Sequence, residues 1–215
     1  MSLRKYFRKK ILPLDLLTQV LSPYCFEKAL DVGAGTGMML EHLYEHGIIR
    51  QGVGVEVASS YFRTINDALE ILSSQDLQAQ QPGKTFDLIV FNDVLHHVKD
   101  KPDFIQQYIS QYLKPGGLVF IKDMDNAHPV YTWANRCHDL VFAGEWIHEI
   151  DPNGVKGILP RFGLLAEGKA RVLWYDHYYL LFQCPEAVSQ ESLAHITQTT
   201  GAQPANPPGE PLLQV

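Results

Sequence analysis

The sequence predicts an α/β fold, in which a doubly wound, mostly parallel sheet of seven strands carries helices on both faces. Two observations predict this fold. Apolar segments of strand length alternate with longer amphipathic segments along most of the chain. A glycine-rich turn directly follows the first apolar segment. The 215 residues are enough for one domain with a full core, and no apolar run reaches the ~20 residues of a membrane-spanning helix.

The segment K-A-L-D-V-G-A-G-T-G-M-M-L, residues 28–40, predicts a buried strand, a glycine turn and the start of a helix. Gly33, Gly35 and Gly37 allow close approach of a ligand to the backbone, and the helix start offers free N–H groups. The spacing differs from the G-x-G-x-x-G of nicotinamide sites. Asp31 precedes the turn, where a carboxylate repels a pyrophosphate but attracts an ammonium or sulfonium group. The turn therefore favours a cationic cofactor.

This segment resembles motif I of the class I S-adenosylmethionine (AdoMet) dependent methyltransferases, and the resemblance continues up to Pro185. It implies a Rossmann-like sheet closed by an antiparallel hairpin, with AdoMet as the cofactor. The second strand, residues 52–56, ends in Glu56 about 20 residues past the last glycine, where a carboxylate can bind both ribose hydroxyls. An ordinary glycine loop is the alternative, and the joint placement of Asp31 and Glu56 argues against it.

The resemblance implies cofactor contacts at four strand ends. Val57 is expected to form an apolar wall beside the adenine, and Asp76 with Leu77 to contact its edge. Ser74 or Gln75 can take that place instead, in which case Asp76 is a simple turn residue. Asn92 and Asp93 are expected at the methionine end. The full expected set is Asp31, Gly33, Ala34, Gly35, Thr36, Gly37, Glu56, Val57, Asp76, Leu77, Asn92 and Asp93.

The remaining elements continue the alternation of strands and helices. The run T-F-D-L-I-V-F is apolar enough for a strand buried on both faces, and K-P-G-G predicts a turn. The expected order is helix 36–46, a helix capped by Ser59 or Ser60 and ending near Ala68, strand 69–73, strand 85–91, helix 101–113, turn 114–117, strand 118–122, and a hairpin of 171–175 and 178–184 around Asp176-His177.

The motif F-N-D-V-L-H-H, residues 91–97, resembles the family's motif IV in the form common among methyltransferases of small molecules. It is not the N-P-P-Y of nucleic-acid amino methyltransferases, so a small-molecule acceptor is expected. His96 or His97 can take a proton from the acceptor. His177 lies at the same rim if the last strand runs antiparallel. Packing alone is the alternative for each histidine.

Three segments flank or interrupt this pattern. Residues 1–22 carry five basic residues among apolar ones and predict a basic helical cap broken near Pro13, which can also make weak contact with an anionic surface. The methyltransferase domain is expected over residues 23–185, followed by a flexible tail rich in Pro and Gln over residues 186–215. Residues 123–168 predict a helical lid after the fifth strand. Candidate pocket residues under the lid are Asp123, Asp125, His128, Trp146, His148 and Glu149.

Composition excludes several classes of function. A formal net charge of -6 argues against a nucleic-acid partner. The three cysteines show no spacing typical of a disulfide framework, and the sequence start lacks a secretory signal. Both observations predict a cytoplasmic location without disulfides. His42, Glu45 and His46 match the inverted zinc-protease motif H-x-x-E-H. Their predicted helix leads away from the strand ends, so no metal is expected.

The sequence thus predicts methyl transfer from AdoMet to an O, N or C nucleophile of a small molecule by in-line displacement. A non-catalytic AdoMet-binding or scaffold protein is one alternative. A protein or tRNA methyltransferase is another, because a local basic patch can suffice. The sequence predicts neither the acceptor nor the oligomeric state.

Overall fold

The computed structural model of the protein describes residues 14–125, 148–172 and 175–186. The chain divides after Pro185, and all described helices and strands belong to the unit before that point. The basic part of the predicted cap, most of the predicted lid and the tail lie outside the described residues. Among the described residues no helix is both long and apolar enough to cross a membrane.

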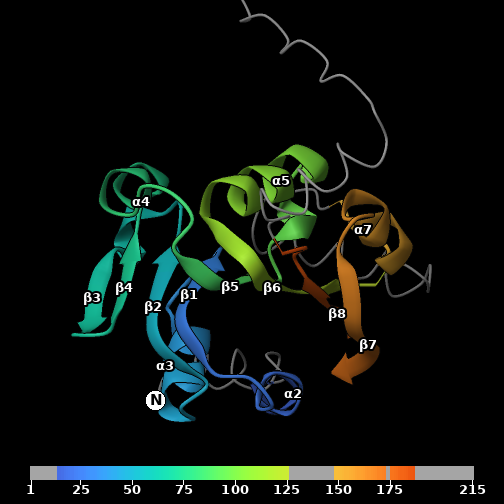
Figure 1. The fold of residues 1–215 in the computed structure, drawn as a ribbon, viewed down its shortest axis with the longest axis horizontal. Coiled ribbons are helices and arrows are strands. Elements are labelled where there is room, and N and C mark those ends of the chain that lie inside the picture. The colour runs from blue at the N-terminus through green and yellow to red at the C-terminus, as the bar shows by residue number, and fades with distance from the viewer. Residues whose placement is uncertain (1–13, 126–147, 173–174, 187–215) are drawn as a thin grey trace, which may run out of the picture. The chain divides into compact units, whose positions relative to one another are not determined.

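One sheet of eight strands forms the centre of the fold, in the order β3-β4-β2-β1-β5-β6-β8-β7 (Figure 1). Strands β4, β2, β1, β5 and β6 are parallel, whereas β3 and β8 run antiparallel to their inner neighbours and β7 runs antiparallel to β8. The strands are β1 Phe26–Val32, β2 Ile49–Val55, β3 Arg63–Asn66, β4 Leu69–Leu72, β5 Phe86–Asn92, β6 Leu113–Met124, β7 Gly163–Val172 and β8 Tyr175–Gln183.

Helices cover both faces of this sheet, as Figure 1 shows. Strand β5 is buried between them: Leu88 and Val90 join the apolar cluster of α2 and α3, while Ile89 and Phe91 join the cluster of α5 and α7. Full burial of each such side chain contributes ~1.5–3 kcal/mol, so the position of β5 is strongly determined. The helices are α2 Leu14–Leu21, α3 Met38–Glu45, α4 Ser74–Gln80, α5 Lys101–Tyr112 and α7 Pro152–Ile158.

The predicted fold class is confirmed, but the sheet has eight strands instead of seven. The additional strand, β3, lies where the sequence predicted a helix up to Ala68. A short 3₁₀ helix, η1 Ser59–Tyr61, is followed directly by β3, which pairs antiparallel with β4. The side chain of Asn66 accepts a hydrogen bond from the N–H of Ala68 at 2.8 Å and stabilises the turn between them. Pairing with β4 therefore overrides the capping signal of Ser59 and Ser60.

The closing hairpin also differs from the prediction. Asp176 and His177 do not form its turn, because β8 already begins at Tyr175 and pairs His177 with Met124 of β6. The N–H of Asp125 donates to the carbonyl of Asp176 at 2.8 Å, which extends this pairing. Strand β7 occupies residues 163–172, so the end of the predicted lid is a strand. Within the predicted helical lid, the side chain of Asp151 caps α7.

Candidate active site

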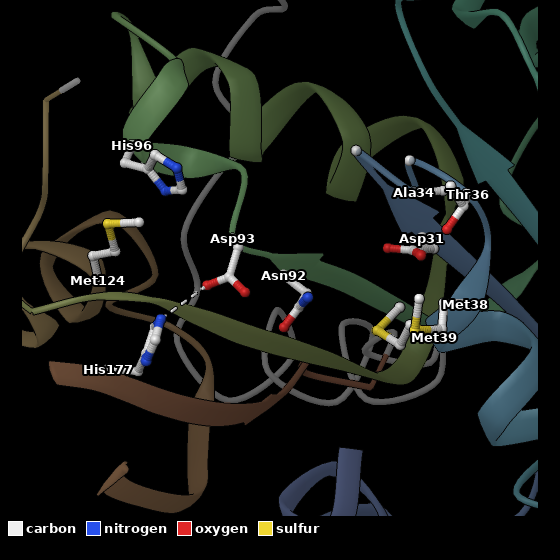
Figure 2. A pocket seen from close by; sticks show the side chains of 12 residues that line it. Asp31, Ala34, Thr36, Met38, Met39, Asn92, Asp93, His96, Met124 and His177 are labelled. Atoms are coloured by element: carbon white, nitrogen blue, oxygen red, sulfur yellow. Dashed lines mark ion pairs between the residues drawn. The ribbon is translucent and has the colours of Figure 1, made fainter. Parts of the chain in front are cut away.

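A cavity of about 200 Å³ lies at the carboxyl ends of β1, β5 and β6, next to the first residues of β8 (Figure 2). Open α/β sheets bind their ligands at this edge. Seven of the expected cofactor residues and two of the three candidate histidines line it. The lining residues are Asp31, Gly33, Ala34, Gly35, Thr36, Met38, Met39, Asn92, Asp93, His96, Met124 and His177.

The glycine turn has the geometry that its sequence predicts. Gly33, Gly35 and Gly37 have φ angles of 82°, 53° and 77°, which side-chain-bearing residues rarely adopt. A Cβ atom at Gly33 would lie 2.6 Å from Val94 Cγ2, and one at Gly37 would lie 2.5 Å from Ile65 Cδ1. The turn is thus held between the chain after β5 and strand β3, with no room for side chains on either side.

Asp31 is a buried carboxyl group at the wall of the cavity. Burial, followed by the negative charge of Glu56, raises the pKa of Asp31 to about 8. A carboxyl group in such surroundings is stabilised in its ionised form when a cation comes beside it. This electrostatic setting supports the predicted contact with an ammonium or sulfonium group.

Glu56 follows β2 and contacts the glycine turn from one side. Its two carboxylate oxygens accept hydrogen bonds from the N–H groups of Gly35 and Val57, each at 2.8 Å. Each carboxylate oxygen has a further lone pair, so Glu56 can still accept hydrogen bonds from ribose hydroxyls. The side chain of Val57 is 94% exposed and is available to cover a planar ring.

Asp76 and Leu77 are not brought to this cavity. Asp76 is exposed in the first turn of α4, where its carboxylate accepts from the Ser73 hydroxyl at 2.6 Å and its N–H donates to the same hydroxyl at 3.0 Å. Leu77 is fully buried in the cluster beneath α5. The capping contacts of Asp76 suit the alternative role of a turn residue, and adenine recognition by this pair stays a prediction.

Asn92, the last residue of β5, offers a hydrogen-bond acceptor to the cavity. Its side-chain oxygen is buried and has no hydrogen-bond partner within the part of the chain that the structure describes. Buried polar atoms nearly always have a partner, so this oxygen marks a place for a donor from a ligand. The amino group of an amino acid is such a donor, and Asp31 on the neighbouring strand complements its charge.

His96 is held by a buried carboxylate. It belongs to the 3₁₀ helix η2 Leu95–His97, and its Nδ1 lies 2.6 Å from Oδ1 of Asp123 at the end of β6. Burial alone would raise the pKa of Asp123, but His96 and the N–H of Met124 lower it below its usual value. The ionised carboxylate can accept a hydrogen bond from Nδ1–H, and in that tautomer of the neutral imidazole Nε2 carries the lone pair. His96 is therefore arranged as a proton acceptor at the cavity.

The other two candidate histidines are placed differently. His97 is exposed and does not line the cavity, and its ring lies against that of His96 with 4.1 Å between centroids. His177 is buried at the cavity wall, and its Nε2 lies 3.6 Å from Asp93 Oδ1. Burial, then the charge of Lys122, lowers the pKa of His177 to about 4. A base this weak is a poor proton acceptor.

Four residues of the site were not expected from the sequence. Met38, Met39 and Met124 line the cavity beside the polar groups, and apolar residues next to a glycine turn give no signal that separates them from core residues. Lys122 is fully buried next to Asp93. A lysine inside the apolar run L-V-F-I-K was the available signal, because lysine is almost never fully buried unless it is paired.

The histidines of the H-x-x-E-H motif lie on α3, away from the cavity lining. His42 Nε2 lies 2.7 Å from the hydroxyl of Thr18 on α2, and His46 Nδ1 lies 2.8 Å from the carbonyl of His42. Within the described ranges, no three His, Cys, Asp or Glu side chains are grouped as metal ligands. The contacts of His42 tie α3 to α2.

Comparison with known proteins identifies the family. Residues 6–167 match the family described as a methyltransferase domain, and the chain belongs to that family. Its methyl donor is S-adenosylmethionine, as the sequence predicted. A ubiquinone biosynthesis O-methyltransferase of Albidiferax ferrireducens is 28% identical over 144 residues, which are 62% of this chain and 53% of that protein. The chain thus spans about half the length of this relative.

Solved structures show the same fold. The YcgJ protein from Bacillus subtilis has a TM-score of 0.64 at 11% identity, covering 81% of this chain and 98% of that one. An O-methyltransferase family protein from Burkholderia thailandensis has a TM-score of 0.63 at 16% identity, covering 84% and 57%. At these identities the likeness confirms the Rossmann-like methyltransferase fold and nothing finer.

Proposed function

We propose that this protein transfers the methyl group of AdoMet to a hydroxyl oxygen of a small-molecule acceptor. The pairing of His96 with Asp123 at the cavity carries this choice of atom, because a hydroxyl group must give up its proton when its oxygen is methylated. Relatives named as O-methyltransferases support the same choice. Methylation of N or C acceptors is the wider possibility that the sequence left open.

The residues around the cavity fit this cofactor. Asp31 and Asn92 offer a carboxylate and an unpartnered amide oxygen to its amino-acid end, and Glu56 offers carboxylate lone pairs to its ribose. Asp93 and the backbone of the glycine turn line the same side of the cavity. Bound there, AdoMet supplies a methyl group activated by a positively charged sulfur. The protein's part is to hold the donor and acceptor in line.

His96 is proposed as the base. As the acceptor oxygen takes the methyl group, its proton passes to Nε2 of His96, and the Asp123 carboxylate stabilises the imidazolium across 2.6 Å. Proton transfer to a positioned base contributes ~10²–10⁴-fold to such a rate. The imidazolium then releases its proton to solvent, and S-adenosylhomocysteine leaves the site.

Methyl-labelled AdoMet, incubated with the protein and a small-molecule extract, tests this function. Mass spectrometry is expected to find the label in an O-methyl product that forms with wild-type protein and much more slowly with His96→Gln. Calorimetry provides the first control, because no AdoMet binding at millimolar concentration would contradict the proposal outright. A label found on nitrogen or carbon would contradict the hydroxyl acceptor alone.

Binding without turnover on any extract would instead favour the non-catalytic AdoMet-binding protein. Label on protein or tRNA would favour the macromolecular alternative, which the net charge of -6 opposes. The cytoplasmic location also stays a prediction. It rests on the cysteines, of which Cys25 and Cys184 are free thiols in the described part of the chain.

A further inference from the structure

Lys122 is a fully buried lysine near the end of β6 that does not line the cavity. Its ammonium group donates hydrogen bonds to both carboxylate oxygens of Asp93, at 2.7 and 2.6 Å. Its carbonyl oxygen accepts a hydrogen bond from the N–H of Asp93 at 2.9 Å. One residue of β6 thus holds Asp93 by its main chain and by its side chain.

Asp93 needs such support because of its backbone. With a φ of 53°, it is the single residue other than glycine with positive φ among those that the structure describes. This conformation is disfavoured for residues with a Cβ atom and persists where surrounding contacts enforce it. The next residue, Val94, packs directly against Gly33. The turn at Asp93 therefore determines how the chain after β5 packs against the glycine turn at Gly33. The glycine turn in turn lines the cavity.

The same carboxylate also faces His177, as Figure 2 shows. Asp93 Oδ1 lies 2.7 Å from Lys122 Nζ and 3.6 Å from His177 Nε2. After burial, Lys122 is the strongest influence that lowers the pKa of His177, and His96 acts in the same direction. Asp93 and Asp123 act in the opposite direction. With Lys122 in place, the charge of Asp93 is neutralised without a proton on the imidazole.

We propose that Lys122 is a positioning residue of the methyl-transfer site, which holds the left-handed turn at Asp93 and keeps His177 uncharged at the cavity wall. This inference rests on the proposed function. The positive charge of Lys122 thereby stays outside the cavity lining. The imidazole of His177, which lines the cavity, stays neutral and does not repel a sulfonium group.

Three variants test this role. Lys122→Met removes the ammonium group and leaves the Asp93 carboxylate unpaired. The double variant Lys122→Met/Asp93→Asn removes both charges, and asparagine tolerates left-handed backbone better than most residues. Lys114→Met is the control for the loss of a lysine–aspartate pair, because Lys114 donates to Asp87 at 2.6 Å at the other, amino-terminal end of β6, where its side chain is 41% exposed.

The first measurement is the titration of His177 by NMR, with its signal identified through a His177→Gln variant. In the wild type, His177 is expected to titrate at about 4. In Lys122→Met the titration is expected to move upward by ~1–2 pH units, because an unneutralised carboxylate favours the imidazolium. The double variant should return to within about half a unit of the wild type, since both opposing charges are gone. An unchanged titration would show that the charge of Lys122 does not act on His177.

The second measurement is the affinity for S-adenosylhomocysteine, which lacks the sulfonium charge, by calorimetry at pH 7.5. Lys122→Met is expected to bind ~10-fold more weakly because the turn relaxes. The Lys114→Met control should match the wild type in both measurements. Unchanged titration and affinity in Lys122→Met would overturn the inference, as would a double variant in which His177 titrates as it does in Lys122→Met.

The two proposals can fail separately. If the wild type binds neither AdoMet nor S-adenosylhomocysteine, the methyltransferase function fails, and with it the functional part of this inference. If the wild type binds both and the three variants bind and titrate like it, only the role of Lys122 fails. Where Lys122→Met does not fold, the double variant still decides, because a His177 titration far from the wild-type value in a folded double variant contradicts the proposed balance of charges.

Discussion

Replacing Asp123 by asparagine removes the charge behind His96 and keeps the size of the side chain. The carboxylate now accepts four hydrogen bonds, from His96 Nδ1 at 2.6 Å and from the N–H groups of Leu95, His96 and Met124 at 2.7, 3.3 and 2.7 Å. An amide has one acceptor oxygen and an NH₂ group that only donates. In Asp123→Asn the NH₂ group must therefore face main-chain N–H groups or the imidazole.

If the NH₂ group faces the imidazole, Nδ1 must accept and the ring proton moves to Nε2, which abolishes the base. The rate is then expected to fall ~10²–10⁴-fold, which corresponds to ~3–5 kcal/mol in the activation barrier. AdoMet affinity should change little, because Asp123 does not line the cavity. In both orientations the NH₂ group also faces a main-chain N–H, that of Met124 beside the imidazole or those of Leu95 and His96 on the other side. This contact should reduce the free energy of unfolding by ~1–3 kcal/mol.

The assay is single-turnover formation of S-adenosylhomocysteine with the acceptor found in the labelling experiment, measured across pH. The wild-type rate should fall at low pH as the imidazole is protonated, and Asp123→Asn should be slow throughout. Asp151→Asn is the control, because Asp151 caps α7 outside the cavity and asparagine is an equally good cap. A folded Asp123→Asn variant with wild-type turnover would refute base catalysis by His96.

Four further outcomes are expected. Because the pKa of Asp31 is raised to about 8, AdoMet binding should release a proton. The affinity for AdoMet should increase by up to ~10-fold per pH unit between pH ~6 and ~8, as calorimetry in two buffers can measure, and Asp31→Asn should lose this dependence. The folded state also holds that proton more tightly than the unfolded chain. The free energy of unfolding of cofactor-free protein should therefore fall by at most ~1.4 kcal/mol per pH unit as the pH rises from ~4 to ~8. Denaturant titrations should show no such slope for Asp31→Asn. Glu56→Ala should weaken AdoMet binding by ~1–3 kcal/mol, and wild-type affinity in this variant would exclude the ribose contact. Gly33→Ala should lower thermal stability much more than Gly47→Ala does. Both glycines have positive φ, but of the two only Gly33 has a neighbour within 4 Å of the added Cβ. Equal losses would show that the Val94 side chain moves aside at little cost.

The sequence predicts best those features whose signal is local. The glycine turn after β1 is specified by three residues that favour positive φ, and its cationic preference by one carboxylate at a fixed spacing, Asp31. Strand β5 is predicted by an apolar run that can only be buried on both faces. The base candidate His96 follows directly from the motif after β5, although its neighbour His97 shares that motif and is exposed.

Features decided by pairing between strands or between side chains were not predictable in this way. Strand β3 is short and lies at the edge of the sheet. Its pairing with β4 outweighs the capping signal of Ser59 and Ser60, which is equally local. Asp176-His177 resembles a turn in sequence, yet His177 is buried against Asp93, which directly follows β5. Lys122 pairs with the same aspartate across 29 residues, and no local pattern in the sequence predicts such a partner.

The tie between Asp93 and Lys122 also constrains how this chain can evolve. Losing the lysine first leaves a carboxylate unpaired, and losing the aspartate first leaves a fully buried ammonium group unpaired. Either single step passes through an isolated charge, whereas exchange of both for neutral residues does not. A lineage that alters one of these positions therefore comes under pressure to alter the other, and position 93 then accepts chiefly glycine or asparagine. Positions 93 and 122 are therefore expected to change together, although one follows β5 and the other lies in β6.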